Sequence, residues 1–189
     1  MTEYEKMLAG EWYFPGDEKL AALRRRAAEV YFAANRLPPG REEERMELLR
    51  PLFGKTGAEF TITPDFHCDY GGNITLGEGF YANYNLVILD CAPVTFGDNV
   101  LVGPGCGFYT AIHPLDAAHR ATGEEKAAPI TVGSDVWFGG NVTVLPGVTI
   151  GDGAVIGAGS VVTRDIPPGV VAAGNPCRVL RPVDQEQAP

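Results

Sequence analysis

The sequence is poor in basic residues, and this shortage excludes some partners before any motif is considered. It holds 15 lysines and arginines against 24 aspartates and glutamates, a formal net charge of -9. Nucleic acid and anionic membrane surfaces are therefore not expected partners. No apolar run is long enough to span a bilayer, and there is no charged-then-apolar leader, so we expect a cytoplasmic protein.

Cysteine and histidine are also scarce. The four cysteines are Cys68, Cys91, Cys106 and Cys177. They form no CxxC pair, so neither a zinc site nor a disulfide framework is predicted. Two of them, Cys68 and Cys106, fall at inward positions of the repeat described below, where a thiol acts as a small hydrophobe. The three histidines, His67, His113 and His119, are too far apart in the repeat pattern to form a three-histidine zinc centre.

A six-residue repeat takes up much of the chain and is clearest between residues 130 and 166. In each hexad an aliphatic or small residue comes first, and a second apolar residue follows two places later. Two inward positions around one outward position form a short strand, and the Gly, Asp, Asn and Pro residues between strands favour turns. This pattern predicts a mainly β fold, a hexapeptide β-helix whose stacked coils bury one core. The first inward positions are Ile130, Val136, Val142, Val148, Ala154, Ser160 and Ile166.

The region before the repeat, residues 1–57, is polar and has helical patterns. Thr2 and Glu5 form a capping box, and Asp17 can cap a longer helix. A third helix follows, and we expect Pro51 to kink it.

Residues 58–183 carry the repeat and a C-terminal cap, and residues 184–189 read as a tail. The repeat disappears between residues 113 and 129, where the sequence is polar and rich in turn formers. We expect this stretch to be a structureless loop thrown out from the β-helix. Such loops on a rigid scaffold are commonly functional.

Several segments together resemble the maltose and galactoside O-acetyltransferases, a family of hexapeptide acyltransferases. The specific ones are YAN at residues 81–83, AIHPLD at 111–116 and VWFGGNV at 136–142, in this order, whereas the hexads alone indicate only the fold. The segment MLAGEWY at residues 7–13 resembles the start of the short helical domain of those enzymes. The resemblance implies a left-handed parallel β-helix, a homotrimer with active sites between subunits, and acetyl-CoA as the donor, with no metal.

The resemblance also implies roles for individual residues. The catalytic histidine falls on His113. Acceptor-side positions fall on Asp17, Asp69, Tyr81 and Asn83, with Glu125 in the loop as a further candidate. Donor-side positions fall on Asn83, Trp137, Gly140, Ala158, Thr163, Arg164, Arg178 and Arg181. Helix capping or turn stabilisation is the competing role for Asp17, Asp69 and Asn83, and a subunit contact is the competing role for Trp137.

Two places depart from the family pattern. Ile112 stands where relatives more often have a small or hydroxylated residue, and we expect it to narrow the acceptor pocket. Asp90 and Cys91 straddle an acidic position that some relatives carry, and the sequence leaves the assignment open between them.

Acetyl transfer to a hydroxyl needs a base, a stabilised oxyanion and a held thioester. Imidazole is the usual base because it titrates near neutral pH, and His113 sits where the repeat breaks, whereas His67 and His119 read as ordinary histidines. The N–H of Gly140 is the candidate oxyanion donor, with a turn role as the alternative. The arginines at positions 164, 178 and 181 stand out on an acidic body and can pair with the phosphates of coenzyme A.

Other functions remain open at this point. The acceptor can be a molecule other than a sugar, because one or two hydrogen bonds redirect an acceptor site. A non-catalytic β-helical assembly module would need neither the loop histidine nor the arginines. A metal-dependent hydrase of the same scaffold would need three converging histidines.

Overall fold

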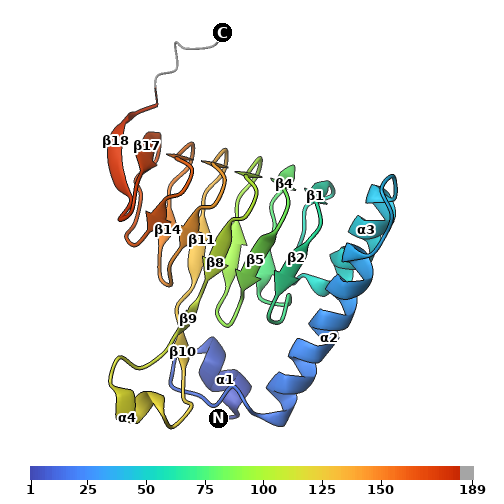
Figure 1. Cartoon of the computed structure of the whole chain (residues 1–189), viewed down its shortest axis with the longest axis vertical. Helices are drawn as coiled ribbons and strands as arrows, with labels where there is room; N and C mark the ends of the chain where they lie inside the picture. Colours follow the sequence, from blue (N-terminus) through green and yellow to red (C-terminus); the bar gives the residue numbers. More distant parts are fainter. Residues whose placement is uncertain (184–189) are drawn as a thin grey trace.

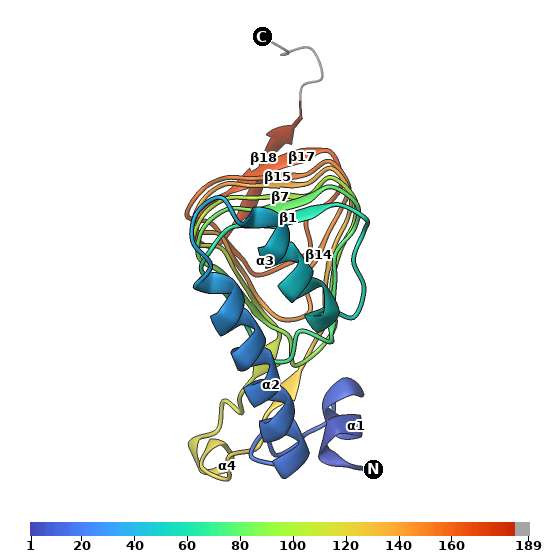
Figure 2. The ribbon, with the colours of Figure 1, turned by 90° about the vertical axis from the view of Figure 1, so that its right-hand side faces the viewer.

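The computed structural model describes residues 1–183, so the expected tail at 184–189 lies outside the described residues. Short parallel strands stack into a solenoid whose three sheets form the sides of a triangular prism (Figures 1 and 2). Each coil visits the seven-stranded sheet, the five-stranded sheet and the four-stranded sheet in turn. The predicted mainly β solenoid is therefore confirmed.

The strands are two to five residues long, as a six-residue repeat requires. The seven-stranded sheet holds β1 (Phe60–Ile62), β4 (Phe80–Ala82), β7 (Leu101–Val102), β12 (Trp137–Phe138), β15 (Val155–Ile156), β17 (Val170–Ala173) and β18 (Arg178–Pro182). The five-stranded sheet holds β2 (Phe66–Cys68), β5 (Leu86–Leu89), β8 (Gly107–Tyr109), β13 (Thr143–Val144) and β16 (Val161–Val162). The four-stranded sheet holds β3 (Ile74–Thr75), β6 (Val94–Phe96), β11 (Ile130–Val132) and β14 (Thr149–Ile150). Only β18 runs antiparallel within these sheets, and it covers β17 at the C-terminal end of the described residues.

The core is a single column of inward side chains from all three sheets. Phe80, Phe96, Phe108 and Phe138 are fully buried and follow one another along the axis. Their ring centroids are 5.0, 4.9 and 5.2 Å apart, with steeply tilted planes. Edge-to-face packing of this kind stabilises the core beyond the burial of apolar area. The prism is therefore a rigid support for the turns at its corners.

Corner turns depend on residues that tolerate a left-handed backbone. The last residue of many turns has positive φ, as in Asn99, Asp135 and Asn141 at +55 to +58°. Asn, Asp and Gly adopt this conformation at little cost, which explains why they recur between the strands.

Three helices precede the solenoid, namely α1 (Glu3–Leu8), α2 (Glu18–Asn35) and α3 (Glu42–Leu49). The capping box of α1 is present as predicted, and the carboxylate of Asp17 accepts hydrogen bonds from the first amides of α2. The kink expected at Pro51 is wrong: α3 ends at Leu49, and a 3-10 turn η1 (Arg50–Leu52) accommodates the proline. Figure 2 shows α3 across the open end of the prism. Within residues 1–183 no helix is long and apolar enough to cross a membrane.

The segment that breaks the repeat projects from the solenoid toward α1 (Figure 1). We call residues 111–127 the excursion arm. The arm begins with β9 (Ala111–Ile112), which pairs antiparallel with β10 (Lys126–Ala127), and α4 (Ala117–Arg120) lies between them. The expectation of a structureless loop is therefore wrong. Asp116 caps α4, and the pairing of β9 with β10 closes the arm at its base.

Candidate active site

A cavity of about 340 Å³ lies where the excursion arm meets α2 and the turns after β2 and β5. It brings together Asp69, His113 and Glu125, three predicted site residues from separate segments. Asp17 does not line this cavity, whereas Pro15, two residues earlier, does. The lining residues are Pro15, Arg24, Asp69, Tyr70, Leu89, Cys91, Ala111, His113 and Glu125.

His113 and Glu125 face each other at the mouth of the cavity. The Nε2 atom of His113 is 3.6 Å from Oε2 of Glu125, which is within ion-pair range and longer than a hydrogen bond. The side chain of His113 is 60% exposed, whereas that of Glu125 is only 10% exposed. The imidazole is therefore accessible to a substrate, and the buried carboxylate beside it can stabilise an imidazolium.

A thiol lies between the two carboxylates of the cavity. The Sγ atom of Cys91 is 3.4 Å from Oδ2 of Asp69 and 4.0 Å from Oε1 of Glu125. Burial raises the pKa of Asp69 and also raises the pKa of the Cys91 thiol. A thiol that stays protonated donates a hydrogen bond and is a poor nucleophile, so the geometry disfavours an acetyl-cysteine intermediate here.

The structure separates the roles of Asp90 and Cys91, which the sequence left open. The carboxylate of Asp90 is fully buried and accepts hydrogen bonds from the amides of Asp69, Tyr70 and Asn73 at 2.8–3.3 Å. Burial raises its pKa to about 6 despite these bonds. Asp90 therefore holds the turn of the preceding coil together, and Cys91 is the one that faces the cavity.

Arg24 and Tyr70 belong to the cavity although the sequence reasoning did not select them. One guanidinium nitrogen of Arg24 donates to the hydroxyl of Tyr70 at 2.7 Å, and the other donates to the carbonyl of Pro15 at 2.6 Å. Arg24 is the first of three consecutive arginines, at positions 24–26. Only the packing of α2 decides which of the three lines this cavity.

Three of the donor-side candidates, Asn83, Gly140 and Ala158, lie elsewhere, at turns that leave the seven-stranded sheet for the five-stranded sheet. We call these turns the open column; their middle residues are Pro64, Tyr84, Pro104, Gly140 and Ala158. Among the described residues, the N–H groups of Gly140 and Ala158 donate to no acceptor. Gly140 also has no positive φ, and a Cβ there would lie 3.3 Å from the carbonyl oxygen of Pro104. The space at Gly140 is tight, and its unpaired amide is available to a ligand.

Gly139 has a different reason to be glycine. A Cβ at Gly139 would lie 2.6 Å from the backbone nitrogen of Ala158 in the next coil. Close stacking of the coils therefore requires glycine at position 139.

Tyr81 and Trp137 lie on the outer face of the seven-stranded sheet, in register with Leu101 between them. All three are exposed, Trp137 by 53%. Asn83 follows β4 and begins a turn of the open column, where its side chain accepts from the amide of Tyr84 at 2.7 Å. Both the ligand wall and the subunit contact considered for Trp137 fit an exposed apolar face of this kind.

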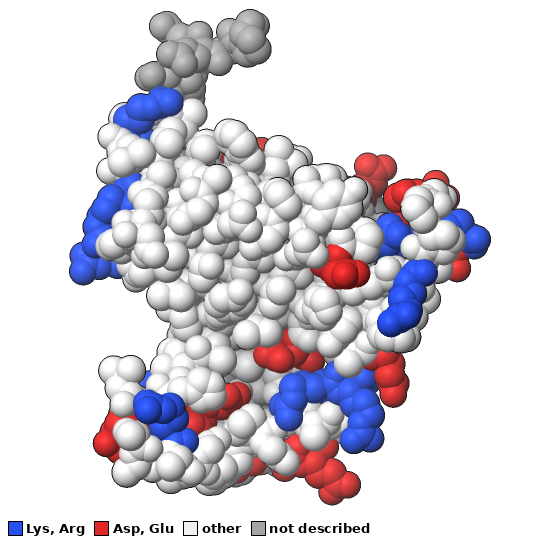
Figure 3. Space-filling model, viewed as in Figure 1, with Lys and Arg blue, Asp and Glu red and all other residues white. Residues whose placement is uncertain are grey.

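The predicted basic residues gather toward the C-terminal end of the solenoid. Thr163 and Arg164 follow β16, and Arg178 and Arg181 lie on β18. Figure 3 shows Lys and Arg side chains beside a largely uncharged body at this end. Anionic groups would meet little negative charge there.

Within one chain, the donor-side candidates of the open column lie apart from the residues of the His113 cavity. The open column and the turns that carry Asp69 and Cys91 run along opposite edges of the five-stranded sheet. No hydrogen bond or ion pair joins Gly140 or Ala158 to His113 among residues 1–183.

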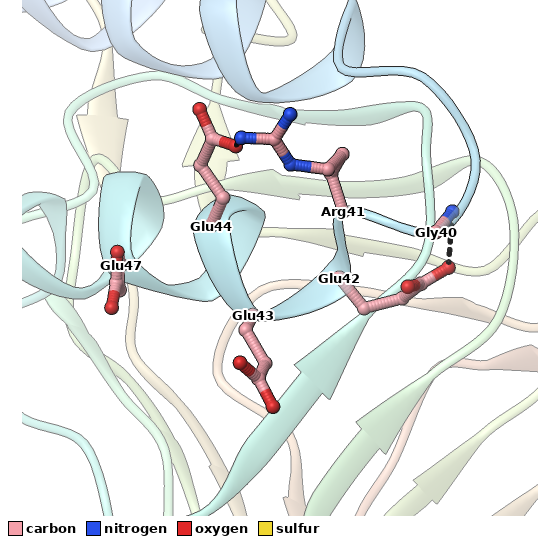
Figure 4. A pocket seen from close by; sticks show the side chains of 6 residues that line it. All are labelled: Gly40, Arg41, Glu42, Glu43, Glu44 and Glu47. Atoms are coloured by element: carbon pink, nitrogen blue, oxygen red, sulfur yellow. Dashed lines mark hydrogen bonds and ion pairs between the residues drawn. The ribbon is translucent and has the colours of Figure 1, made fainter.

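A larger hollow lies elsewhere and carries none of these residues. It has a volume of about 600 Å³ and lies at the start of α3 (Figure 4). Arg41 pairs with Glu44, and Glu42 accepts from the amide of Gly40, so two of its four carboxylates already have partners. The three histidines do not converge either, because His67 packs on Tyr31 and His119 pairs with Glu124.

The chain matches two family descriptions. Residues 6–57 match the maltose acetyltransferase hexapeptide capping motif, and residues 129–164 match the bacterial transferase hexapeptide, six repeats. These matches define the class as a hexapeptide-repeat transferase with a helical cap. A Staphylococcus aureus protein named as a putative acetyltransferase is 52% identical over 187 residues, which cover 98% of this chain and 94% of that protein.

Two solved structures narrow the class. A maltose O-acetyltransferase from Clostridium difficile superposes with a TM-score of 0.96 at 46% identity, covering 98% of this chain and 99% of that one. A galactoside acetyltransferase in complex with coenzyme A superposes with a TM-score of 0.94 at 43% identity, covering 97% and 92%. The chain belongs to the maltose and galactoside acetyltransferase family, and its solenoid is the left-handed parallel β-helix of that family.

Proposed function

We propose that the protein transfers the acetyl group of acetyl-CoA to a hydroxyl of a sugar, with His113 as general base. The observation that carries the proposal is the exposed imidazole of His113 beside the buried carboxylate of Glu125, at the mouth of a cavity. Asp69, Arg24 and Glu125 supply the acceptors and donors that a polyhydroxyl ring needs, and Leu89 and Ala111 supply apolar walls.

The donor is proposed to bind along the open column. The unpaired amides of Gly140 and Ala158 offer hydrogen bonds to the thioester end, and the amide of Gly140 is the candidate for the oxyanion. Thr163, Arg164, Arg178 and Arg181 lie toward the end where the phosphates of coenzyme A would be paired. The complex of the related galactoside acetyltransferase with coenzyme A supports acetyl-CoA as the donor.

The assembly is proposed to be a homotrimer with sites between subunits. The open column of one chain and the His113 cavity of its neighbour would then form one site, which a single chain cannot do. The exposed Leu101 and Trp137 on the seven-stranded sheet supply apolar surface for such contacts.

The reaction is written as a direct transfer. The imidazole of His113 takes the proton of the acceptor hydroxyl while that oxygen bonds to the thioester carbonyl carbon. The tetrahedral intermediate then collapses, the carbon–sulfur bond breaks, and the leaving thiolate takes up the proton from the imidazolium. The protonated, buried thiols of Cys68, Cys91 and Cys106 support a mechanism without an acetyl-enzyme.

The test is His113→Ala, assayed by release of free coenzyme A thiol against a panel of sugars, serine and amines. Turnover should fall about 10²–10⁴-fold, the usual share of general base catalysis. Coenzyme A binding and oligomeric state should be unchanged because His113 lies outside the solenoid core.

The matched control is His119→Ala, which removes the other histidine of the excursion arm and should keep most of the turnover. Near-normal turnover of His113→Ala would contradict the assignment of the base. Acetylation of serine or amines without acetylation of any sugar would contradict the proposed acceptor.

A further inference from the structure

The segment before α2 holds the carboxylate that faces His113. Tyr13 is fully buried. Its amide donates to the carbonyl of Glu125 at 2.9 Å, and the amide of Glu125 donates back to the carbonyl of Tyr13 at 3.0 Å. The hydroxyl of Tyr13 also donates a short hydrogen bond to Oε1 of Glu125. Three bonds thus join two residues that are 112 positions apart in the sequence.

The two oxygens of Glu125 have different neighbours. Oε1 accepts from the Tyr13 hydroxyl and has Sγ of Cys91 at 4.0 Å, whereas Oε2 faces Nε2 of His113. A carboxylate is planar, so tying one oxygen also sets the direction of the other. The hydroxyl of Tyr13 therefore decides whether Glu125 points at the imidazole.

Other contacts between the N-terminal segment and the excursion arm do not reach this carboxylate. The ring of Trp12 packs on the ring of His119 at 4.7 Å, and Nζ of Lys126 lies 5.0 Å from the Trp12 ring. These contacts anchor the arm. The contact of the Tyr13 hydroxyl is the one that acts on the Glu125 side chain itself.

We propose that Tyr13 is a positioning residue for the His113–Glu125 pair, and that the helical cap thereby forms part of the active site. The proposal rests on the proposed function, in which His113 becomes an imidazolium during transfer. A carboxylate already held at the right angle stabilises that charge without reorganising. Loss of the Tyr13 hydroxyl would leave Glu125 free to rotate, and the transition state would lose this support.

The test is Tyr13→Phe, which removes the hydroxyl and keeps the ring. The kcat should fall about tenfold, the usual effect of one lost hydrogen bond to a charged group. The KM for acetyl-CoA should stay within about twofold, because the donor column is distant from Tyr13. The matched control is Tyr4→Phe, the same change at a tyrosine packed on the same apolar cluster whose hydroxyl bonds no other described residue. A kcat of Tyr13→Phe equal to that of Tyr4→Phe would overturn the proposal.

A double variant separates positioning from general damage. If Tyr13 acts through Glu125, Tyr13→Phe combined with Glu125→Gln should be no slower than Glu125→Gln alone. Independent, multiplying losses would overturn the proposal. If Tyr13→Phe does not fold, Glu125→Asp asks the same question, because the shorter side chain cannot reach both Tyr13 and His113. Its kcat should fall at unchanged donor KM, and a wild-type kcat would overturn the proposal.

The turnover of His113→Ala distinguishes a failure of this proposal from a failure of the proposed function. If His113→Ala retains turnover, the proposed function fails and the positioning proposal fails with it. If His113→Ala loses turnover while Tyr13→Phe matches its Tyr4→Phe control, only the positioning of Glu125 by Tyr13 is wrong.

Discussion

Two columns of corner turns have the same backbone design. They differ in whether a side chain accepts a hydrogen bond from the amide of the middle residue. We call the turns that leave the four-stranded sheet the capped column; their middle residues are Glu78, Asp98, Ser134, Asp152 and Pro168. In this column a side chain of the next coil accepts from the amides of Glu78, Asp98 and Ser134, as Asp152 does from Ser134 at 2.8 Å. The amide of Asp152 is not capped in this way, because the next coil has Pro168 at that position. In the open column no side chain accepts from Gly140 or Ala158 among the described residues.

The comparison separates the features that every turn of the repeat needs from a feature that individual turns can lack. Both columns need stacking glycines and left-handed turn residues, because coils pack closely and the chain must turn. A side-chain cap on the middle amide is optional. A polar amide left without a protein partner at an exposed corner can bond water or a ligand, which is why we propose the open column for the donor.

The largest expected effect on turnover comes from substituting proline for the middle residue of a turn, once in each column. Proline already occupies the middle position in both columns, at Pro64 and Pro104 in the open column and at Pro168 in the capped column, so the turn accepts it. Gly140→Pro removes an amide that bonds no protein acceptor. The thermal midpoint should therefore be nearly unchanged, while turnover should fall about 10²–10³-fold if this amide holds the oxyanion.

Ser134→Pro is the matched substitution in the capped column. It removes the hydrogen bond from the Ser134 amide to Asp152 and also the Oγ that accepts from the amide of Asp98, so it should lower the unfolding free energy by about 1–3 kcal/mol, with turnover unchanged. The comparison fails if both variants lose turnover equally, or if Gly140→Pro is the less stable of the two.

The second effect concerns the corner between the five-stranded and the four-stranded sheet. There the carboxylate of Asp90 accepts hydrogen bonds from amides of the preceding coil. Burial raises the pKa of Asp90 to about 6, above the value of 3.8 for a free side chain. The folded state then binds the proton more tightly than the unfolded state, so stability should fall as pH rises from about 4 to about 6. The loss from this group is about 3 kcal/mol at most.

Chemical unfolding from pH 4 to pH 7, with Asp90→Asn as the reference, checks this effect. The wild type should lose stability relative to the variant across the interval, because asparagine does not titrate. A constant difference between the two proteins would show that the pKa of Asp90 is not raised.

The third effect separates two neighbouring glycines within the open column. Gly139→Ala places a Cβ 2.6 Å from the backbone of Ala158, and it should cost about 1–3 kcal/mol of unfolding free energy. Gly140→Ala places its Cβ 3.3 Å from the carbonyl oxygen of Pro104 and keeps the amide, so it should cost less than Gly139→Ala. Thermal unfolding of the two variants gives the order, and the reverse order would contradict close stacking at Gly139.

The sequence by itself determined the solenoid, its register and its turns. A period of six with inward residues two apart specifies which side chains face the core, and the positions of glycine, asparagine and aspartate specify the turns. The break in that period also marked the arm that carries His113. These features are local, so each hexad predicts its own conformation.

Only the tertiary structure decided how the arm, the helical cap and the turns share one cavity. It placed Pro15 and not Asp17 in the lining of the cavity, and it showed that Cys91 and not Asp90 faces the cavity. It also brought the hydroxyl of Tyr13 to the carboxylate of Glu125. The expected structureless loop and the kink at Pro51 were wrong for a related reason, because caps and strand pairs formed by partners outside the repeat govern those segments. A periodic pattern reports which face of its own strand a residue occupies, whereas contacts over 112 positions depend on how separate segments pack against one another.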